Sequence, residues 1–311
     1  MRAPVLHDCD PGNDDALAIL AALGSATLDL KAVTTGAGHL ASDRTAQNAA
    51  ITLGVARRNS VPVTRGAEGP LVRERLIAQL LDFEHGLDTQ RDDLPTVAIQ
   101  PNETSAEAIT RFAMQETGLT IVTTGPLTNL ALALRTAPAT ASRLVRIVML
   151  AGAWGLGNKT AAAEWNVLCD PEAAAIVFAC GAPLTLVPID AGAQVTIDDA
   201  LVEAISAPGG PVANFAAEVL RSLRSTYRPG PFGPRDAPLN DPLAVLVAAS
   251  SKLARSVPAR VEIELAGKHT YGRTVVDFAD RSPLGPNCQV VVEFDVAATR
   301  RAFIEAINAL G

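Results

Sequence analysis

Four aspartates near the start of the chain form its clearest candidate for chemistry. They are Asp8, Asp10, Asp14 and Asp15, in the segment DCDPGNDD that follows an apolar run at residues 3–7. The Pro-Gly pair inside this segment predicts a tight turn that returns the last two carboxylates toward Asp10. Carboxylates about 4 Å apart repel each other by roughly 4 kcal/mol at an effective dielectric constant near 20, so a cation would stabilise the cluster. Oxygen ligands favour a hard ion, Ca²⁺ or Mg²⁺, over zinc.

A purely structural interpretation of these aspartates stays open. Asp14 and Asp15 could complement the positive end of a helix dipole, worth about 0.3–1 kcal/mol each, while Asp8 or Asp10 caps the turn. A glycine-rich phosphate loop is excluded, because no GxGxxG follows the first apolar run and no GxxxxGK[ST] occurs in the sequence.

The elements that must position this cluster follow an alternating pattern. Short β-rich apolar runs alternate with Ala/Leu-rich segments of helical period, which is typical of β-α units. We therefore predict an α/β fold with a doubly wound, mostly parallel central sheet and helices on both faces. The predicted strands are 3–7, 29–34, 119–123, 144–150 and 183–188, and the predicted helices are 15–23, 42–57, 105–116, 170–180 and 199–205. The aspartates then lie at the carboxyl end of the first strand, where open α/β sheets bind ligands.

The pattern changes after about residue 255. Strands are predicted at 260–265, 274–278 and 289–294 without helices between them, before a final helix at 297–310. We interpret them as a small antiparallel extension of one domain spanning residues 1–311, because no linker separates them. Mobile loops are expected at 68–95 and 227–240.

Composition narrows the class of protein. The chain has 311 residues, of which 48% are hydrophobic and 19% charged, with a net charge of -7. Its lysines are scattered without a basic run, so we expect no nucleic-acid partner. No apolar run approaches the roughly 18 residues of a membrane span, and no signal peptide is evident, so a soluble cytoplasmic protein without a membrane partner is expected. The four cysteines are far apart and are expected to be reduced thiols.

The first acidic motif is one of several motifs in this sequence that match a single protein family. Asp8-x-Asp10-Pro11-Gly12-x-Asp14-Asp15 resembles the fingerprint of the inosine-uridine preferring nucleoside hydrolases. Further motifs of that family are matched in the same order by Thr34–Gly38, His85-Gly86, Thr123–Asn129, Gly157-Asn158, Ala163–Asn166, Asp170–Ala173 and Asp241-Pro242. The resemblance covers nearly the whole chain.

The resemblance implies Ca²⁺-dependent hydrolysis of the N-glycosidic bond of ribonucleosides, giving ribose and a free nucleobase. It implies that one Ca²⁺ is bound by Asp10, Asp15, Asp241 and the backbone carbonyl of Thr124, and that Asp10 accepts the proton of the attacking water. A small-molecule ribonucleoside would be the substrate, and a homodimer or homotetramer the assembly. The residues implied to hold the ribose hydroxyls are Asp14, Asn158, Glu164 and Asn166.

Two positions depart from the family pattern. His39 stands where members usually carry Asn beside the sugar. Asn240 stands where many carry the histidine credited with contacting or protonating the leaving base, and an amide cannot act as a general acid. Substitute donors are His85, Tyr227 and His39 itself. Trp154 and Trp165 could stack on a base, although at least one of the two is expected in the core.

Local explanations compete with each assigned role. Asn158 could be a turn residue, Glu164 and Asn166 could belong to a helix-capping loop, and Thr124 could simply end a buried strand. Asp241 could be the N-cap of a helix that begins with Pro242. His7 and His269 are expected to be structural.

Two rival functions also stay open. One is a nucleoside-binding or regulatory protein that has lost turnover, which His39 and Asn240 motivate. The other is a haloacid-dehalogenase-like phosphohydrolase, which also begins with Asp-x-Asp after its first strand. The second rival leaves the Glu164–Asn166 and Asn240-Asp241 motifs unexplained.

Overall fold

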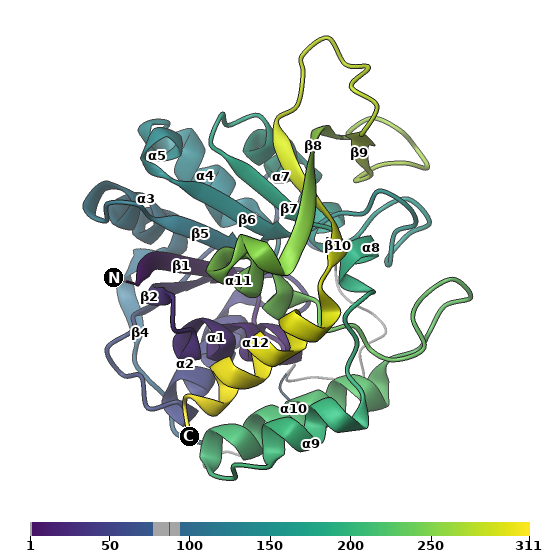
Figure 1. Cartoon of the computed structure of the whole chain (residues 1–311). Coiled ribbons are helices and arrows are strands. Elements are labelled where there is room, and N and C mark those ends of the chain that lie inside the picture. Colours follow the sequence, from purple (N-terminus) through teal and green to yellow (C-terminus); the bar gives the residue numbers. More distant parts are fainter. Residues whose placement is uncertain (1, 77–86, 88–93) are drawn as a thin grey trace.

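A computed structural model describes residues 2–76, 87 and 94–311. Its centre is a ten-stranded sheet in the order β4-β3-β2-β1-β5-β6-β7-β10-β8-β9, with helices packed on both faces (Figure 1). The strands are β1 (Ala3–Cys9), β2 (Leu28–Thr35), β3 (Val63–Arg65), β4 (Ile99–Thr104), β5 (Thr120–Thr123), β6 (Arg146–Leu150), β7 (Leu184–Val187), β8 (Ala254–Ile263), β9 (Thr274–Asp277) and β10 (Cys288–Phe294). The predicted α/β class is confirmed.

The sheet is parallel from β4 through β10, and only its last two pairings are antiparallel. β10 pairs parallel with β7 and antiparallel with β8, which in turn pairs antiparallel with β9. The predicted extension is therefore confirmed, but the assignment of residues 289–294 to it is only half correct, because β10 continues the parallel body. β8 also begins at Ala254, earlier than predicted, since its first half pairs with β10.

Two groups of helices cover the two faces of the sheet (Figure 1). One face carries α1 (Asn13–Gly24), α2 (Ser42–Val55), α9 (Asp199–Ser206), α10 (Pro211–Thr226), α11 (Asp241–Ala249) and α12 (Val296–Asn308), and the other carries α3 (Ser105–Gln115), α4 (Thr128–Thr136), α5 (Ala139–Arg143) and α7 (Pro171–Phe178). Each face buries its own apolar cluster, one around α1 and α12 and one around α3, α4 and α7. The short helices α6 (Trp165–Cys169) and α8 (Ile189–Gly192) lie in the connections.

Local sequence signals explain several boundaries. α3 begins with the predicted capping box, in which the Thr104 N–H donates to Glu107 Oε2 at 2.8 Å and the Glu107 N–H donates to Thr104 Oγ1 at 3.3 Å. β4 was not predicted because its sequence, IQPNET, is polar and largely exposed at the edge of the sheet. No helix among the described residues is long and apolar enough to cross a membrane.

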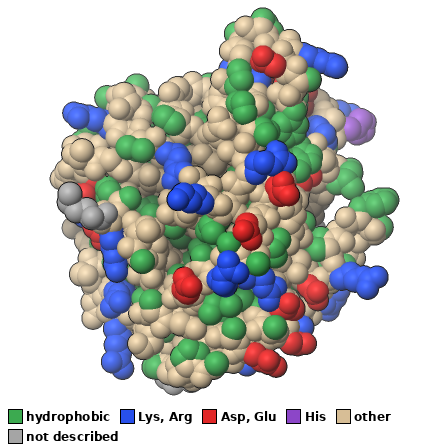
Figure 2. Space-filling view, viewed as in Figure 1, with side chains coloured by type: hydrophobic (Ala, Val, Ile, Leu, Met, Phe, Trp, Pro, Cys, Tyr) green, Lys and Arg blue, Asp and Glu red, His purple; other side chains and the backbone are tan. Residues whose placement is uncertain are grey.

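The surface mixes charges of both signs. On the face seen in Figure 2, Lys and Arg side chains are interspersed with Asp and Glu. One exposed ion pair joins β8 to β10, where Arg255 Nε lies 3.0 Å from Glu293 Oε2. Exposed pairs of this kind contribute at most about 1 kcal/mol each.

The strand order places a ligand site between β1 and β5. The chain builds outward from β1 to β4 on one side and then returns to the other side of β1 with β5. Diverging connections at such a reversal leave a crevice at the carboxyl ends of the two strands. The segments that follow these ends contain Asp10 and Thr124.

Candidate cation and substrate site

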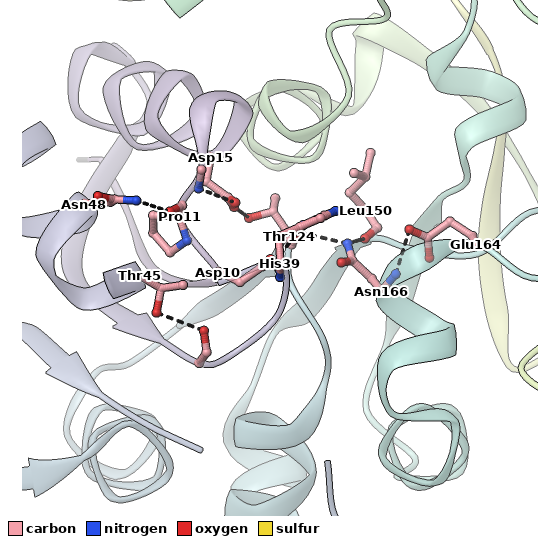
Figure 3. Close-up of polar contacts among 12 residues, drawn as sticks. Asp10, Pro11, Asp15, His39, Thr45, Asn48, Thr124, Leu150, Glu164 and Asn166 are labelled. Atoms are coloured by element: carbon pink, nitrogen blue, oxygen red, sulfur yellow. Dashed lines mark hydrogen bonds and ion pairs between the residues drawn. The ribbon is translucent and has the colours of Figure 1, made fainter. Parts of the chain in front are cut away.

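The loops at the carboxyl ends of the central strands are tied together by backbone groups. The Thr124 N–H donates to Asp8 O at 3.0 Å, and the Gly36 N–H donates to Cys9 O at 3.0 Å. From α2, Asn48 Nδ2 donates to Pro11 O at 2.8 Å. These bonds fix the turn that carries Asp10 before α1 begins (Figure 3).

The carboxylate of Asp10 is buried between two glycine-containing loops. Its Oδ2 accepts hydrogen bonds from the backbone N–H of His39 at 3.0 Å and from His39 Nδ1 at 3.2 Å. A Cβ atom at Gly38 would lie 2.0 Å from Asp10 Oδ2, and one at Gly125 would lie 2.6 Å from Oδ1. Both loops therefore need glycine to approach this carboxylate.

Three other carboxylates gather where the first turns of α1 and α11 meet. Ligand oxygens of Asp14, Asp15 and Asp241 all lie within 4.8 Å of one another, and the side chains of Asp14 and Asp241 share a hydrogen bond. Burial, followed by repulsion from neighbouring carboxylates, raises the pKa of Asp15 and of Asp241 well above the usual range. A largely buried, oxygen-only set in which ionisation is disfavoured in this way fits a hard divalent cation.

The structure corrects the predicted start of α11. The helix begins at Asp241 itself, and Asn240 is its N-cap with a positive φ of 40°. The alternative local explanation, in which Asp241 is the N-cap, is therefore wrong, because the bend at Asn240 brings Asp241 into the first turn. Its carboxylate contacts Asp14 of α1 instead.

Thr124 joins the carboxylate cluster to the neighbouring polar groups. Its hydroxyl donates to Asp15 Oδ1 at 2.5 Å, and its carbonyl accepts from Asn166 Nδ2 at 2.8 Å. His7 Nε2 lies 2.8 Å from the same hydroxyl. Thr124 directly follows the buried strand β5, close to what its local explanation expects, and it also contacts Asp15 and Asn166.

Glu164 and Asn166 lie on the other side of Thr124 from Asp15 (Figure 3). Glu164 is the N-cap of α6, accepting from the N–H groups of Asn166 and Val167, and it also accepts from the Gly152 N–H at 2.8 Å. Burial raises the pKa of its carboxyl group. Asn166 Nδ2 also donates to Leu150 O at 3.1 Å, so the amide oxygen is its remaining polar atom for a ligand.

His39 is held over the site by an aromatic stack. Its ring lies 4.2 Å from that of Trp165, at an interplanar angle of 19°. Burial lowers the pKa of His39, but the hydrogen bond and charge of Asp10, with the charges of Asp14 and Glu164, outweigh it and raise the pKa above its usual value. Trp165 is 4% exposed, so it is the core tryptophan of the predicted pair.

The remaining predicted residues lie farther out. Asn158 is exposed, and its Oδ1 accepts from the Trp165 N–H at 2.9 Å, as a turn residue would. Trp154 is half-buried and packs edge-on against Phe278 at 5.7 Å. Tyr227 donates to Pro234 O at 3.0 Å and lines a cavity of about 380 Å³ with Arg221, Arg224, Ser225, Arg235, Asp236 and Ala237. His85 lies outside the described residues.

Asn240 presents an unsatisfied group. Its Oδ1 is buried without a hydrogen-bond partner among the described residues, and a Cβ atom at Gly192 would lie 3.2 Å from it. Buried acceptors are normally satisfied, so this oxygen is free to meet a ligand or water.

Sequence reasoning missed the role of Asn129. Its Nδ2 donates to Asp8 Oδ1 at 2.9 Å and to Thr35 O at 3.1 Å, and its Oδ1 accepts from the Ala67 N–H at 2.9 Å. Asp8 also accepts from Thr34 Oγ1 at 2.7 Å. Asp8 is therefore a structural carboxylate that fastens β1, β2 and α4 together, and the motif Thr123–Asn129 was the only signal for its partner.

Comparison with known proteins identifies the family. A model of the inosine-uridine preferring nucleoside hydrolase family matches residues 5–301. The chain is 39% identical, over 99% of its length and 97% of the relative's, to the pyrimidine-specific ribonucleoside hydrolase RihA of Escherichia coli. Identity to the RihA of Salmonella arizonae is 38%, with 99% and 97% of the two chains covered.

Solved structures agree with this result. The purine-preferring ribonucleoside hydrolase from Gardnerella vaginalis superposes with a TM-score of 0.89 at 27% identity, covering 99% of this chain and 98% of that one. An inosine-guanosine nucleoside hydrolase gives 0.89 at 27% identity, with 99% of both chains covered.

A mostly parallel sheet with an oxygen-lined site at its carboxyl edge, matched over its whole length by these proteins, defines a nucleoside hydrolase. The chain belongs to the inosine-uridine preferring nucleoside hydrolase family. Membership excludes the haloacid-dehalogenase-like alternative.

Proposed function

We propose that this enzyme hydrolyses the N-glycosidic bond of pyrimidine ribonucleosides with one bound Ca²⁺, releasing ribose and the free base. The observation that carries the proposal is the carboxylate cluster of half-buried Asp14 with buried Asp15 and Asp241, beside buried Asp10. The base preference is supported by the relatives named pyrimidine-specific, which match at 39% and 38% identity, whereas the purine-preferring structure matches at 27%.

The proposed ligands of the cation are Asp10, Asp15, Asp241 and the Thr124 carbonyl. The all-carboxylate group within 4.8 Å contains Asp14 and not Asp10. The carboxylate of Asp10 is turned toward His39. A second group within the same distance joins His7 and Cys9 to Asp15. An ion held by the proposed ligands would offset their negative charge and would supply a water molecule of lowered pKa, a nucleophile near neutral pH.

Asp10 is the proposed base. One of its oxygens is held by two hydrogen bonds from His39, so the carboxylate is fixed in orientation while acceptor positions remain for the proton of an attacking water. His39 cannot rotate freely, since it is stacked on Trp165. The base is therefore oriented before substrate arrives.

The ribose would lie between the carboxylates and the segment 164–166. Asp14, Glu164 and the amide oxygen of Asn166 are the proposed partners of its hydroxyls, with Asn158 at the exposed rim. N-glycosidic cleavage passes through an oxocarbenium-like transition state, which the negative charge of the Asp14 and Glu164 carboxylates would stabilise. Holding the sugar also aligns the anomeric carbon with the nucleophile.

A substrate panel tests the proposal. We expect kcat/KM for uridine and cytidine to exceed that for inosine, adenosine and guanosine by at least about 10-fold, which corresponds to roughly 1.4 kcal/mol of transition-state binding. Release of reducing sugar measures turnover. Faster hydrolysis of a purine nucleoside would overturn the base preference, and calorimetric binding of all five without sugar release would favour the nucleoside-binding alternative.

The residue before Asp241 provides a second prediction. Asn240 can hydrogen-bond a departing base but cannot protonate it, and general acid catalysis contributes typically about 10²–10⁴-fold. We therefore expect kcat for nitrophenyl riboside, whose leaving group needs no proton, to exceed kcat for inosine widely. Asn240→His should narrow the gap by raising inosine turnover.

Asn240→His should change kcat for the nitrophenyl riboside little. Equal kcat values for the two substrates in the parent enzyme, with His39→Ala, His85→Ala and Tyr227→Phe all harmless, would show that proton delivery by a side chain does not limit turnover.

A further inference from the structure

His7 is a fully buried polar side chain in the centre of the sheet. It lies on β1, opposite Val33 of β2 and Val122 of β5, and none of its surface is exposed. Burial lowers its pKa to about 3, so the imidazole is neutral at pH 7. An apolar residue would fill this position at lower cost in desolvation, so its hydrogen bond is the feature to explain.

The hydrogen bond of His7 has a defined direction when a cation is bound. Asp15 is a proposed ligand of the cation, and a carboxylate that would hold a cation accepts hydrogen bonds and does not donate them. The Thr124 hydroxyl has one hydrogen, which must then go to Asp15 Oδ1 at 2.5 Å. The contact of 2.8 Å between His7 Nε2 and Thr124 Oγ1 therefore requires that His7 donates.

Two consecutive hydrogen bonds result: His7 donates to the Thr124 hydroxyl, and this hydroxyl donates to Asp15. Thr124 is fixed at two further points, because its N–H donates to Asp8 O and its carbonyl accepts from Asn166 Nδ2. We propose that His7 is a positioning residue of the cation site, which fixes the rotamer of Thr124 and through it the Asp15 carboxylate. The inference rests on the proposed function of that site.

A positioning role makes a measurable difference to cation affinity. Without the donor, Thr124 can change rotamer, so cation binding must order both Thr124 and Asp15. Groups that orient metal ligands typically contribute about 10–100-fold to metal affinity. We expect His7→Leu to raise the Kd for Ca²⁺ about 10-fold, while kcat at saturating Ca²⁺ changes less than about twofold.

The experiment titrates Ca²⁺ into the chelated full-length protein, with calorimetry and thermal unfolding as readouts. His7→Gln restores an N–H donor and should return the Kd to near the parent value. His7→Leu should unfold, when chelated, at a temperature no lower than the chelated parent, because it removes a buried polar group. If His7 were merely structural, His7→Leu would lower the unfolding temperature of the chelated protein and leave the Kd for Ca²⁺ unchanged. Thr120→Val, a buried change at the amino end of β5, is the control and should bind Ca²⁺ like the parent.

A double-mutant cycle tests the route of the effect. If His7 acts through the Thr124 hydroxyl, adding His7→Leu to Thr124→Val should weaken Ca²⁺ binding no further. An unchanged Kd in His7→Leu, or losses that add in the double variant, would overturn the inference alone. Failure of the parent itself to bind Ca²⁺ would overturn the proposed cation site and this inference together.

Discussion

Asp10→Asn is expected to lower kcat for uridine by at least 10²-fold, within the range of about 10²–10⁴ that general bases contribute. The amide keeps the size of the side chain and an oxygen that can still accept from the His39 N–H, a bond of 3.0 Å in the parent. It cannot take a proton from the attacking water. Steady-state kinetics at saturating Ca²⁺ measure the change.

The control for this variant is Asp198→Asn, which alters a carboxylate at the N-cap of α9. It should leave kcat unchanged. The thermal unfolding temperature of Asp10→Asn should stay close to that of the parent, since no apolar contact is removed. Near-parent kcat in Asp10→Asn would mean that another group is the base.

Removal of the cation is expected to abolish turnover and to destabilise the fold. A ligand that binds only the folded state stabilises it by about 2.7 kcal/mol at 100 times its Kd, so chelation should lower the unfolding temperature by several degrees. Without the cation, the clustered carboxylates of Asp14, Asp15 and Asp241 would have to repel one another or take up protons. Calorimetry of unfolding, with and without a chelator, measures the shift.

Back-titration identifies the ion. Ca²⁺ should restore both stability and turnover, while Asp241→Ala should respond to neither chelator nor Ca²⁺ because it lacks a proposed ligand. Full turnover after exhaustive chelation would contradict the proposed cation chemistry. Restoration by Zn²⁺ alone would assign the site to a different metal.

The sequence was most informative where structure is local. The alternation of strands and helices, the capping box at Thr104 and the turn after β1 each depend on neighbouring residues, and the structure contains all of them. The position of Asp10 at the carboxyl end of β1 follows from the same local pattern.

Contacts between segments far apart in the sequence could not be predicted from local sequence patterns. The stack of His39 on Trp165 and the bond from Asn129 to Asp8 each join residues far apart in the sequence, which the fold brings together at one edge of the sheet. The sense of β10 was equally hidden, because an apolar run in a strand reads the same in parallel and antiparallel pairings. The start of α11 depended on the unusual backbone of Asn240.

The meeting of α1 and α11 has a consequence for synthesis and folding. Asp15 enters the site from the beginning of the chain and Asp241 from a helix made much later, so a nascent or truncated chain that ends before α11 lacks part of the proposed cation site. High-affinity Ca²⁺ binding would therefore report the completed molecule and not its amino-terminal half. A preparation could then be assayed for its fraction of intact, correctly folded enzyme by cation binding alone, without any substrate.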